Sequence, residues 1–558
     1  MLRIAPIFMI AILIGPVLAG LFHIIVPAFG HDPELGQIGF SLQAFYALKM
    51  MPAIMKSIWL SYWLGLMTAF ISLMLVAFFI ASYRNSYWFL VIKTMFKPVL
   101  AMPHAAAAFG LAFLIMPSGF IIRLISPELT GFIRPPDWLI INDPAGFALL
   151  LGLVIKEIPF LLLVILASLP QVEGQYSRVA RISGYGKNYA WLISVFPLIY
   201  KKIRLPIYAL IAFATSVVDV ALILGPATPP PLSIQILRLM SDPDLTQRSI
   251  AAAAAIVQFG VTILALITWW IGEKIFIHFG KKIIMSGFRF QGDKILGFIG
   301  FVGVGGAIFM TFVGLFLLAL WSVSGIWKFP QVFPAELSFS TWHNEASQLL
   351  KVSWRAIIIA FFASFIAIIL ALSSLENEYQ RQIKLSKWAK FILFLPLLVP
   401  QVSFLFGLFI IFLWHGLDGN YFSLIFAHLI FTLPYVYLLL SDSWNGFDIR
   451  YLTSARLMGK SQMNVFFSIR LPMLLRPILM AFALGFAISI AQYLPTLLIG
   501  AGRFPTITTE AVALASGGNR RLIGTYSLVQ TLLPFVVFAI AALIPALLFH
   551  NRKGLNNE

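Results

Sequence analysis

The sequence contains no cysteine, and only 11% of its 558 residues are charged. The lack of cysteine excludes disulfides, Cys-ligated zinc and iron–sulfur clusters. A soluble chain of this length usually divides into several cores joined by polar linkers. Here 60% of the residues are hydrophobic, and apolar stretches of spanning length recur from end to end. The lipid bilayer is therefore the expected solvent of this protein.

Acidic residues are scarce as well. The chain has 21 Asp and Glu against 39 Lys and Arg, a formal net charge of +18. A nucleic-acid binder would gather such cations in an arm, or in a stripe interleaved with stacking aromatics. Neither pattern is present, because the basic residues stand in short segments between apolar runs. We expect the bilayer, and no nucleic acid, as a partner.

Twelve apolar runs are long enough to cross a bilayer as helices. They lie near 4–28, 58–82, 96–116, 146–168, 204–226, 250–272, 295–321, 354–374, 391–414, 421–441, 477–500 and 526–548. We interpret the first as an uncleaved anchor, because it is long enough to span. With the N-terminus inside, about two thirds of the basic residues fall on the cytoplasmic side. This bias predicts a multi-pass protein of a bacterial inner membrane with both termini cytoplasmic.

The polar segment 273–294 divides these runs into six and six. A shift of 275 residues superposes the largest polar loops of the two halves, 169–203 and 442–476. The matched pairs are Pro159 with Pro434, Glu173 with Asp448, Tyr176 with Tyr451, Arg181 with Arg456, Gly184 with Gly459 and Pro197 with Pro472. Six spans return the chain to its starting side, so the copies run parallel. We predict a first repeat at 1–272, a cytoplasmic linker at 273–294 and a second repeat at 295–558.

Each of the two loops carries a spaced motif. The second reads Thr453-Ser454-Ala455-x3-Gly459-x9-Ile469-x-Leu471-Pro472, and the first reads Arg178-Val179-Ala180-x3-Gly184-x9-Ser194-x-Phe196-Pro197. The motif resembles the EAA loop of ABC importer permeases, written E-A-A-x3-G-x9-I-x-L-P. Both loops depart from that pattern at its acidic first position, where Arg178 and Thr453 stand. The duplication within one chain is most similar to the branch that includes thiamine and ferric-iron permeases.

The resemblance implies an all-α membrane protein of about twelve transmembrane helices in two parallel six-helix repeats, the type I (MetI-like) importer permease fold. In that family each EAA loop forms two short helices with a turn at the glycine and docks into a groove of an ATP-binding subunit. The expected partners are therefore two identical ATP-binding subunits and an external substrate-binding protein. The expected cargo is a small solute such as thiamine or ferric iron. The residues assigned to coupling are Ala180, Arg181, Gly184, Pro197, Ala455, Arg456, Gly459, Leu471 and Pro472.

The residue types suit such coupling. Glycine adopts positive φ and lets a partner backbone approach, and alanine leaves a surface that packs closely. The later proline fixes the chain where it re-enters the membrane, so movement of the loop passes to the fifth span.

No nucleotide-binding motif accompanies these loops. Gly459-Lys460-Ser461 approaches a phosphate-binding loop, but Ser454 stands where its first glycine is required. The segment also opens no strand-to-helix turn. We expect this chain to bind no cofactor and to be no enzyme, with ATP bound and hydrolysed on the separate subunits.

Charges inside a span are costly, which makes Lys156, Glu157 and Asp219 candidates for the transport pathway. Gln492 stands at the corresponding end of the other fifth span, so we include it. The depths of Lys156 and Asp219 differ by roughly 5 Å, which allows an ion pair. Such a pair could fasten two helices or contact substrate.

Other polar residues stand singly on apolar faces, where helix-to-helix hydrogen bonds are their commonest role. They are Gln258, Gln401, His428, Gln492 and Gln530. His104 and His428 lack an Asp, Glu or His at i+3 or i+4, so no metal site is expected.

A secondary transporter of the major-facilitator type is the alternative, since it also has two six-helix halves. That family usually carries a short basic G-x3-D-R-x-G-R-R-like loop between its second and third helices. Here the loop reads only Tyr83-Arg84-Asn85-Ser86-Tyr87.

Overall fold

A computed structural model describes residues 5–31, 39–171, 176–381 and 387–549. The described residues form helices and no β-strand, apart from one isolated antiparallel bridge between Ser324 and Leu337. The helices of the first half are α1 Ala5–Ala28, α2 Gln43–Met50, α3 Ile54–Tyr83, α4 Tyr87–Ala101, α5 His104–Ile115, α6 Phe120–Leu124, α7 Phe147–Ser168, α8 Tyr176–Ile182, α9 Lys187–Ser194, α10 Phe196–Ser216, α11 Asp219–Leu224, α12 Leu232–Met240 and α13 Gln247–Met285.

The second half follows in the same order. Its helices are α14 Lys294–Ser322, α15 Ser340–Arg381, α16 Lys387–Leu398, α17 Gln401–Trp414, α18 Tyr421–Asn445, α19 Arg450–Leu457, α20 Gln462–Val465, α21 Leu471–Met473, α22 Leu475–Ala491, α23 Leu494–Ile499, α24 Ile507–Ala513 and α25 Arg520–Leu548, with a π-helical turn at Phe466–Arg470. Nine helices among the described residues are long and apolar enough to span a membrane, or eleven if two bent pairs each count as one span. The all-α membrane fold is thereby confirmed.

Several of the expected spans are longer, or more broken, than hydropathy indicates. The helix α13 continues through the first part of the expected linker to Met285, so the irregular connection to α14 is only 286–293. The third span of each half breaks before a proline, at Pro103 between α4 and α5 and at Pro400 between α16 and α17. Proline lacks the amide hydrogen that a continuing helix needs. The second of these breaks turns the chain by 89°.

The fifth span of each half breaks as well; no proline stands at the first break, and Pro495 is in the first turn of the helix after the second. The helix α10 ends at Ser216 and α11 begins at Asp219, while α22 ends at Ala491 and α23 begins at Leu494. The helix α10 is less apolar than the nine spanning helices among the described residues, because Lys201, Lys202 and Arg204 lie in its first half. The single continuous helices expected at 204–226 and 477–500 are therefore each two helices.

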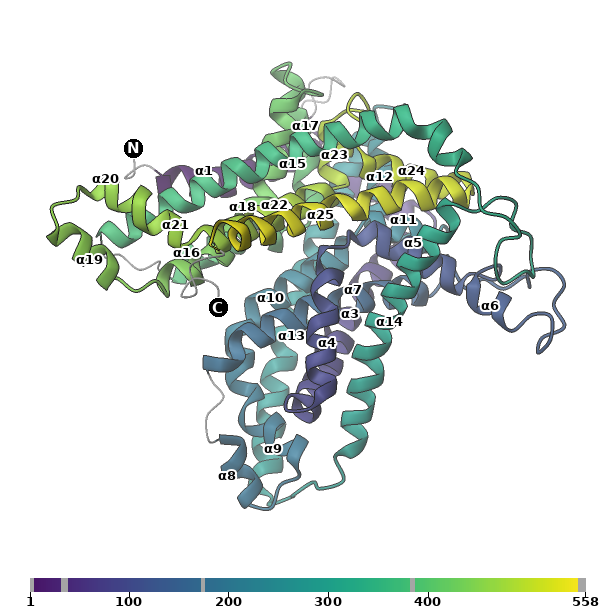
Figure 1. Cartoon of the computed structure of the whole chain (residues 1–558). Helices are drawn as coiled ribbons and strands as arrows, with labels where there is room; N and C mark the ends of the chain where they lie inside the picture. The colour runs from purple at the N-terminus through teal and green to yellow at the C-terminus, as the bar shows by residue number, and fades with distance from the viewer. Residues whose placement is uncertain (1–4, 32–38, 172–175, 382–386, 550–558) are drawn as a thin grey trace.

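The helices form two bundles that cross (Figure 1). In this view α3, α4, α7, α10, α13 and α14 stand upright, and α1, α15, α18, α22 and α25 run across the top. The short helices α8 and α9 lie at the lower end of the upright bundle, and α19 and α20 lie at the left end of the other. Large apolar side chains such as Phe309, Phe316 and Phe361 remain exposed, as a surface facing lipid requires.

The first helix of each half packs into the opposite bundle. The helix α1 crosses α17 of the second half, and α14 crosses α5 of the first. Both crossings are built on glycine pairs. A Cβ on Gly20 would lie 2.2 Å from the Phe404 carbonyl oxygen, and one on Gly407 would lie 2.0 Å from the Gly20 oxygen. At the other crossing, Gly110 and Gly314 face each other with a Cβ distance of 2.9 Å to the opposing backbone. Only glycine allows backbones to approach this closely.

Candidate coupling loops and intramembrane polar site

The first candidate coupling loop consists of α8, a turn and α9. The turn depends on Gly184, whose φ is +91°. Its amide donates to the Arg181 carbonyl at 3.0 Å, and the Tyr185 amide donates to the Ala180 carbonyl at 3.4 Å. This is the hydrogen-bond pattern of a Schellman motif, which ends a helix with a residue in the left-handed region. The motif therefore contains Gly184 and also Ala180 and Arg181, whose carbonyls accept the hydrogen bonds that end α8.

The second loop repeats this turn bond for bond. Gly459 has a φ of +82° and donates to the Arg456 carbonyl at 3.0 Å. The Lys460 amide donates to the Ala455 carbonyl at 3.2 Å. The helices α19 and α20 stand on either side of the turn. Both loops thus have the geometry that the resemblance implies, two short helices joined at the glycine.

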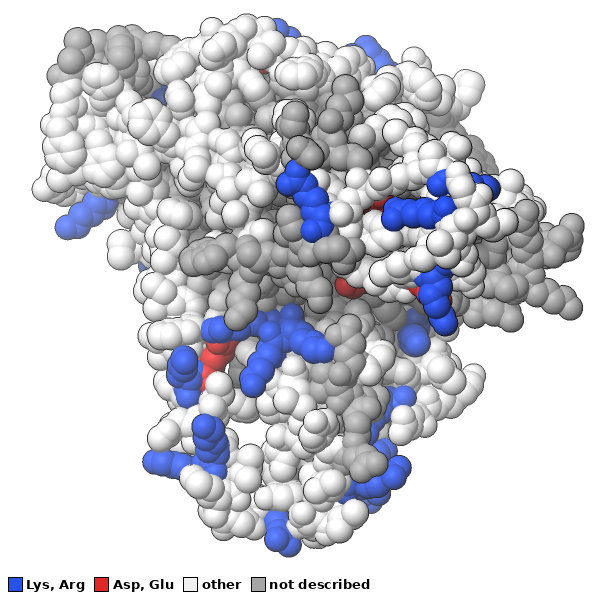
Figure 2. All heavy atoms as spheres, turned by 90° about the vertical axis from the view of Figure 1, so that its left-hand side faces the viewer, with Lys and Arg blue, Asp and Glu red and all other residues white. Residues whose placement is uncertain are grey.

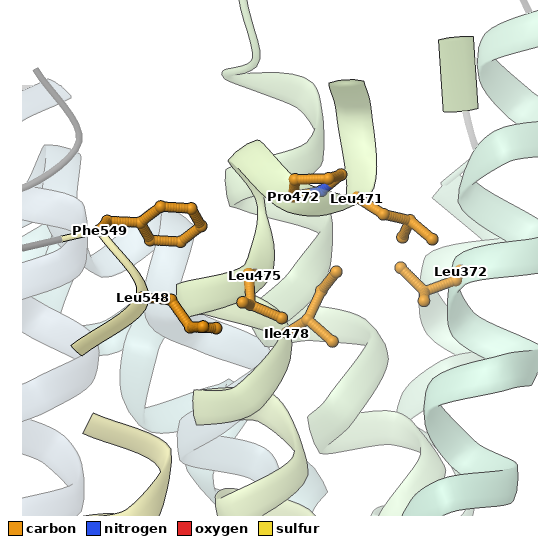
Figure 3. A pocket seen from close by; sticks show the side chains of 7 residues that line it. All are labelled: Leu372, Leu471, Pro472, Leu475, Ile478, Leu548 and Phe549. Carbon is orange, nitrogen blue, oxygen red and sulfur yellow. The ribbon is translucent and has the colours of Figure 1, made fainter. Parts of the chain in front are cut away.

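The prolines of the two motifs lie at the return to the membrane. Pro197 is exposed and is the second residue of α10. Pro472 lies in α21, and the chain then bends by 71° into α22. Beneath this elbow lies an apolar hollow of about 490 Å³ (Figure 3). Its lining residues are Leu372, Leu471, Pro472, Leu475, Ile478, Leu548 and Phe549. None of these lining residues has a polar side chain that could bind a solute, and the hollow leaves space for the bend between α21 and α22 to move.

The connection between the halves docks on the first loop. The carboxylate of Asp293 accepts hydrogen bonds from the backbone amides of Asn188, at 2.6 Å, and Tyr189, at 2.9 Å, in the first turn of α9. The Asn188 side chain donates in return to the Asp293 carbonyl at 3.0 Å. The Gly186 amide donates to the Phe290 carbonyl at 3.1 Å. Asp293 therefore caps α9 from a distance and joins the first loop to the start of α14.

We expect Asp293→Ala to loosen this loop, because two amides at the start of α9 lose their acceptor. The cost should be about 1–2 kcal/mol, as for removal of a helix cap. Limited proteolysis of the purified protein should show faster cleavage within 176–194. Asp293→Asn retains an acceptor oxygen and is the matched control. Equal cleavage of the alanine variant and the wild-type protein would contradict the capping role.

The second loop is anchored differently, by a buried ion pair. Arg470, in the π-helical turn, donates to Glu376 of α15 at 2.7 Å, and their side chains are 3% and 6% exposed. The guanidinium carbon lies 3.9 Å from the ring centre of Trp444 and 4.2 Å from that of Tyr379. The residue that corresponds to Arg470 in the first half is the buried Val195. The ionic anchor is therefore particular to the second loop.

The intramembrane charges meet partners other than those considered from the sequence. The ammonium of Lys156 donates to the carbonyls of Val99 at 2.9 Å and Met102 at 2.5 Å, at the end of α4. It thus caps the broken third span, and it forms no ion pair with Asp219 among the described contacts. The Met102 carbonyl thereby gains a donor where the break before Pro103 ends α4, and the Val99 carbonyl, which also accepts the Met102 amide at 3.3 Å, gains a second one.

Glu157 and Asp219 both interact with a residue that sequence reasoning set aside. The Nε2 atom of His104 lies 3.4 Å from a carboxylate oxygen of Glu157. His104 also interacts electrostatically with Asp219, the first residue of α11. Both carboxylates are buried, at 5% and 9% exposure. In the sequence, only the position of His104 directly after Pro103 could have indicated its role, because a proline marks a possible helix break that hydropathy does not reveal.

Single polar residues hold the breaks of the fifth spans, in agreement with the expected helix-to-helix hydrogen bonds. Gln258 donates to the Thr215 carbonyl at 3.0 Å, where α10 ends. The ring of His428 bridges the hydroxyls of Ser489 at 2.8 Å and Thr496 at 2.9 Å, one on each side of the second break.

Gln530 supports the same break indirectly. It donates to the Thr508 hydroxyl at 3.0 Å, and that hydroxyl donates to the Ile490 carbonyl. Gln492 lies at the break itself, as the C-cap of α22. Asp219 and Gln492 thus occupy the interruptions of the two fifth spans.

Comparison with known proteins defines the class. A family model described as binding-protein-dependent transport system inner membrane component matches residues 363–552. The inner membrane ABC transporter permease protein YnjC of Escherichia coli (strain K12) is 32% identical over 463 residues, which cover 82% of this chain and 81% of YnjC. The chain belongs to this family of ABC transporter permeases, whose described members are inner-membrane proteins.

Relatives of lower identity carry a substrate in their names. The spermidine/putrescine transport system permease protein PotC of Haemophilus influenzae is 24% identical over 196 residues, which cover 35% of this chain and 76% of PotC. PotC of Escherichia coli (strain K12) is 24% identical over 141 residues, which cover 25% of this chain and 53% of PotC. These comparisons support a multi-pass inner-membrane permease and give no support to a major-facilitator transporter. The family match lies within the second half, and duplication of the first half stays a prediction.

Proposed function

We propose that this chain forms the translocation pathway of an ATP-driven, binding-protein-dependent importer. The observation that carries the proposal is the pair of Schellman turns at Gly184 and Gly459, each between two short helices outside the spans. The two loops dock on two identical ATP-binding subunits, which hydrolyse ATP. The permease itself catalyses no reaction and binds no cofactor. Both termini lie in the cytoplasm, and an external protein delivers the solute.

The proposed cargo is a small cation. Two buried carboxylates, Glu157 and Asp219, lie near breaks in the third and fifth spans. The nearby ammonium of Lys156 is directed to the α4 carbonyls, so it does not pair with Asp219. Asp219 thus has no lysine or arginine partner among the described residues, and such a buried carboxylate favours a positively charged solute. Thiamine, ferric iron and polyamines share this charge.

The test is purification of the permease together with its ATP-binding subunit, followed by reconstitution with the binding protein. We expect ATP-dependent uptake of one cation among thiamine, spermidine and ferric iron. Asp219→Asn should reduce that uptake at least tenfold, because the neutral amide loses the charge attraction, while the ATP-binding subunit stays bound. The exposed Asp244→Asn is the matched control. Uptake driven by a proton gradient without ATP would overturn the importer, and an unchanged Asp219→Asn variant would overturn the cation pathway.

A further inference from the structure

The outward faces of the two coupling helices carry matching side chains that nothing in the described chain covers. Tyr176 on α8 is 56% exposed, and the corresponding Tyr451 on α19 is 54% exposed. At the far end of each helix, Ile182 is 81% exposed and Leu457 is 84% exposed. Aromatic and aliphatic side chains of this size, exposed twice at equivalent positions, are typical of an interface with another protein.

Cations accompany these apolar side chains, and acidic residues are few. Arg178 and Arg181 are exposed on α8, and neither has an acidic partner among the described residues. On the second loop Arg456 and Lys460 are exposed in the same way. Figure 2, which views the molecule from the left-hand side of Figure 1, where α19 and α20 lie, shows many Lys and Arg and few acidic side chains among the described atoms.

The acid at the start of α19 does not offset this excess. Arg450 donates to both carboxylate oxygens of Asp448, from Nε to Oδ1 at 3.0 Å and from Nη2 to Oδ2 at 2.6 Å. These hydrogen bonds lower the pKa of Asp448, so the carboxylate stays ionised and neutralises Arg450. Arg456 and Lys460 therefore keep their charge free for a partner.

The position that the EAA pattern assigns to an acid lies at the centre of each outward face. Arg178 and Ile182 are four residues apart, so they lie one above the other on α8. Thr453 and Leu457 have the same relation on α19. Because this position is a threonine, the face has no carboxylate here either, and the Thr453 hydroxyl donates to the Ile449 carbonyl of its own helix at 3.3 Å. The polarity of the surface is thus opposite to that of the family pattern.

We propose that the ATP-binding subunits of this transporter present acidic docking grooves. One groove accepts Tyr176, Ile182 and the flanking cations of α8, and the other accepts the corresponding residues of α19. The proposal rests on the proposed function, because it requires that the loops dock on those subunits. A lipid surface is the rival occupant, since anionic headgroups also attract cations. The location favours a protein, because α8, α9, α19 and α20 lie at the ends of the bundles (Figure 1) and the apolar residues point outward.

The test places glutamate at the acidic position of the EAA pattern in both loops and measures whether the permease then binds its ATP-binding subunit more weakly or more tightly. The permease is purified and mixed with its purified ATP-binding subunit, and the dissociation constant is measured at low and physiological salt. For Arg178→Glu and Thr453→Glu combined, we expect at least tenfold weaker binding, because carboxylates would then face the acidic grooves. Arg178→Lys should bind like the wild-type protein. Lys281→Glu, on the exposed side of α13, is the matched control for a charge change elsewhere on this side.

The outcomes separate the two levels of the proposal. If the wild-type permease does not bind the ATP-binding subunit, the proposed function fails. If it binds and the double variant binds equally well or more tightly, the grooves are not acidic and this inference is overturned. The measurement is repeated in nanodiscs of zwitterionic and of anionic lipid. A loss confined to anionic lipid would mean that the cations serve the membrane surface, which also overturns the inference.

Discussion

Gly20→Leu and Gly314→Leu should each prevent the two halves from assembling. A Cβ at either position would lie within 2.9 Å of a backbone atom of the opposing helix, and a backbone cannot rotate away as a side chain can. We expect a loss of about 3 kcal/mol or more per site, the upper range of overpacking. The readout is the fraction of detergent-purified protein that elutes as a monodisperse peak and resists trypsin.

The same helices provide matched controls. Gly15 on α1 and Gly305 on α14 have no atom of the described chain within 4 Å of the position that a Cβ would occupy, so leucine is accommodated there. Gly15→Leu and Gly305→Leu add the same side chain to the same helix, and they should elute and resist trypsin like the wild-type protein. Equal behaviour of Gly20→Leu and Gly15→Leu would refute the close crossing of α1 and α17.

Arg470→Met should have the second large effect. It leaves the carboxylate of Glu376 buried without its cation, and breaking a buried ion pair in this way costs about 3–5 kcal/mol. The second loop should then lose its fixed connection to α15. The thermal unfolding temperature of the purified protein should fall, and the rate of ATP hydrolysis by the assembled transporter should fall as well.

The double variant Glu376→Leu with Arg470→Met distinguishes a structural pair from a lone essential arginine. Because both charges are removed, much of the lost stability should return. Recovery of stability without recovery of ATP-driven uptake would show that the ionic anchor transmits movement as well as holding the loop. A double variant as unstable as Arg470→Met alone would contradict the pairing.

Much of the fold could be predicted from periodicity and spacing, and the breaks could not. Hydropathy measures average composition, and the apolar residues on both sides of Asp219 give the segment that contains α10 and α11 the appearance of one continuous span. What permits that break is Gln258, which reaches the Thr215 carbonyl from a helix 43 residues further along the chain. The second break depends likewise on His428 and Thr508. These partners are tertiary, so no local pattern reveals them.

The coupling turns were predictable because a Schellman motif is local, and glycine at its left-handed position leaves a mark in the sequence. The intramembrane site was predictable only as a set of residues. Depth along a helix allowed Lys156 to meet Asp219, but rotation about the helix axis and the end of α4 direct it to Met102 instead. His104 was set aside for want of sequence neighbours, although Glu157 reaches it from another helix.

Because the first helix of each half packs against the other half, the order of translation determines when these contacts can form. The helix α1 is complete at Ala28, yet the helix that it crosses begins only at Gln401. At roughly 5–20 residues per second, translation of the intervening chain takes on the order of tens of seconds. Throughout that interval the glycine surface of α1 faces lipid or the insertion machinery. The helix α1 can pack on α13 once residue 285 has been made, but its glycine contact with α17 forms only when the last third of the chain is synthesised.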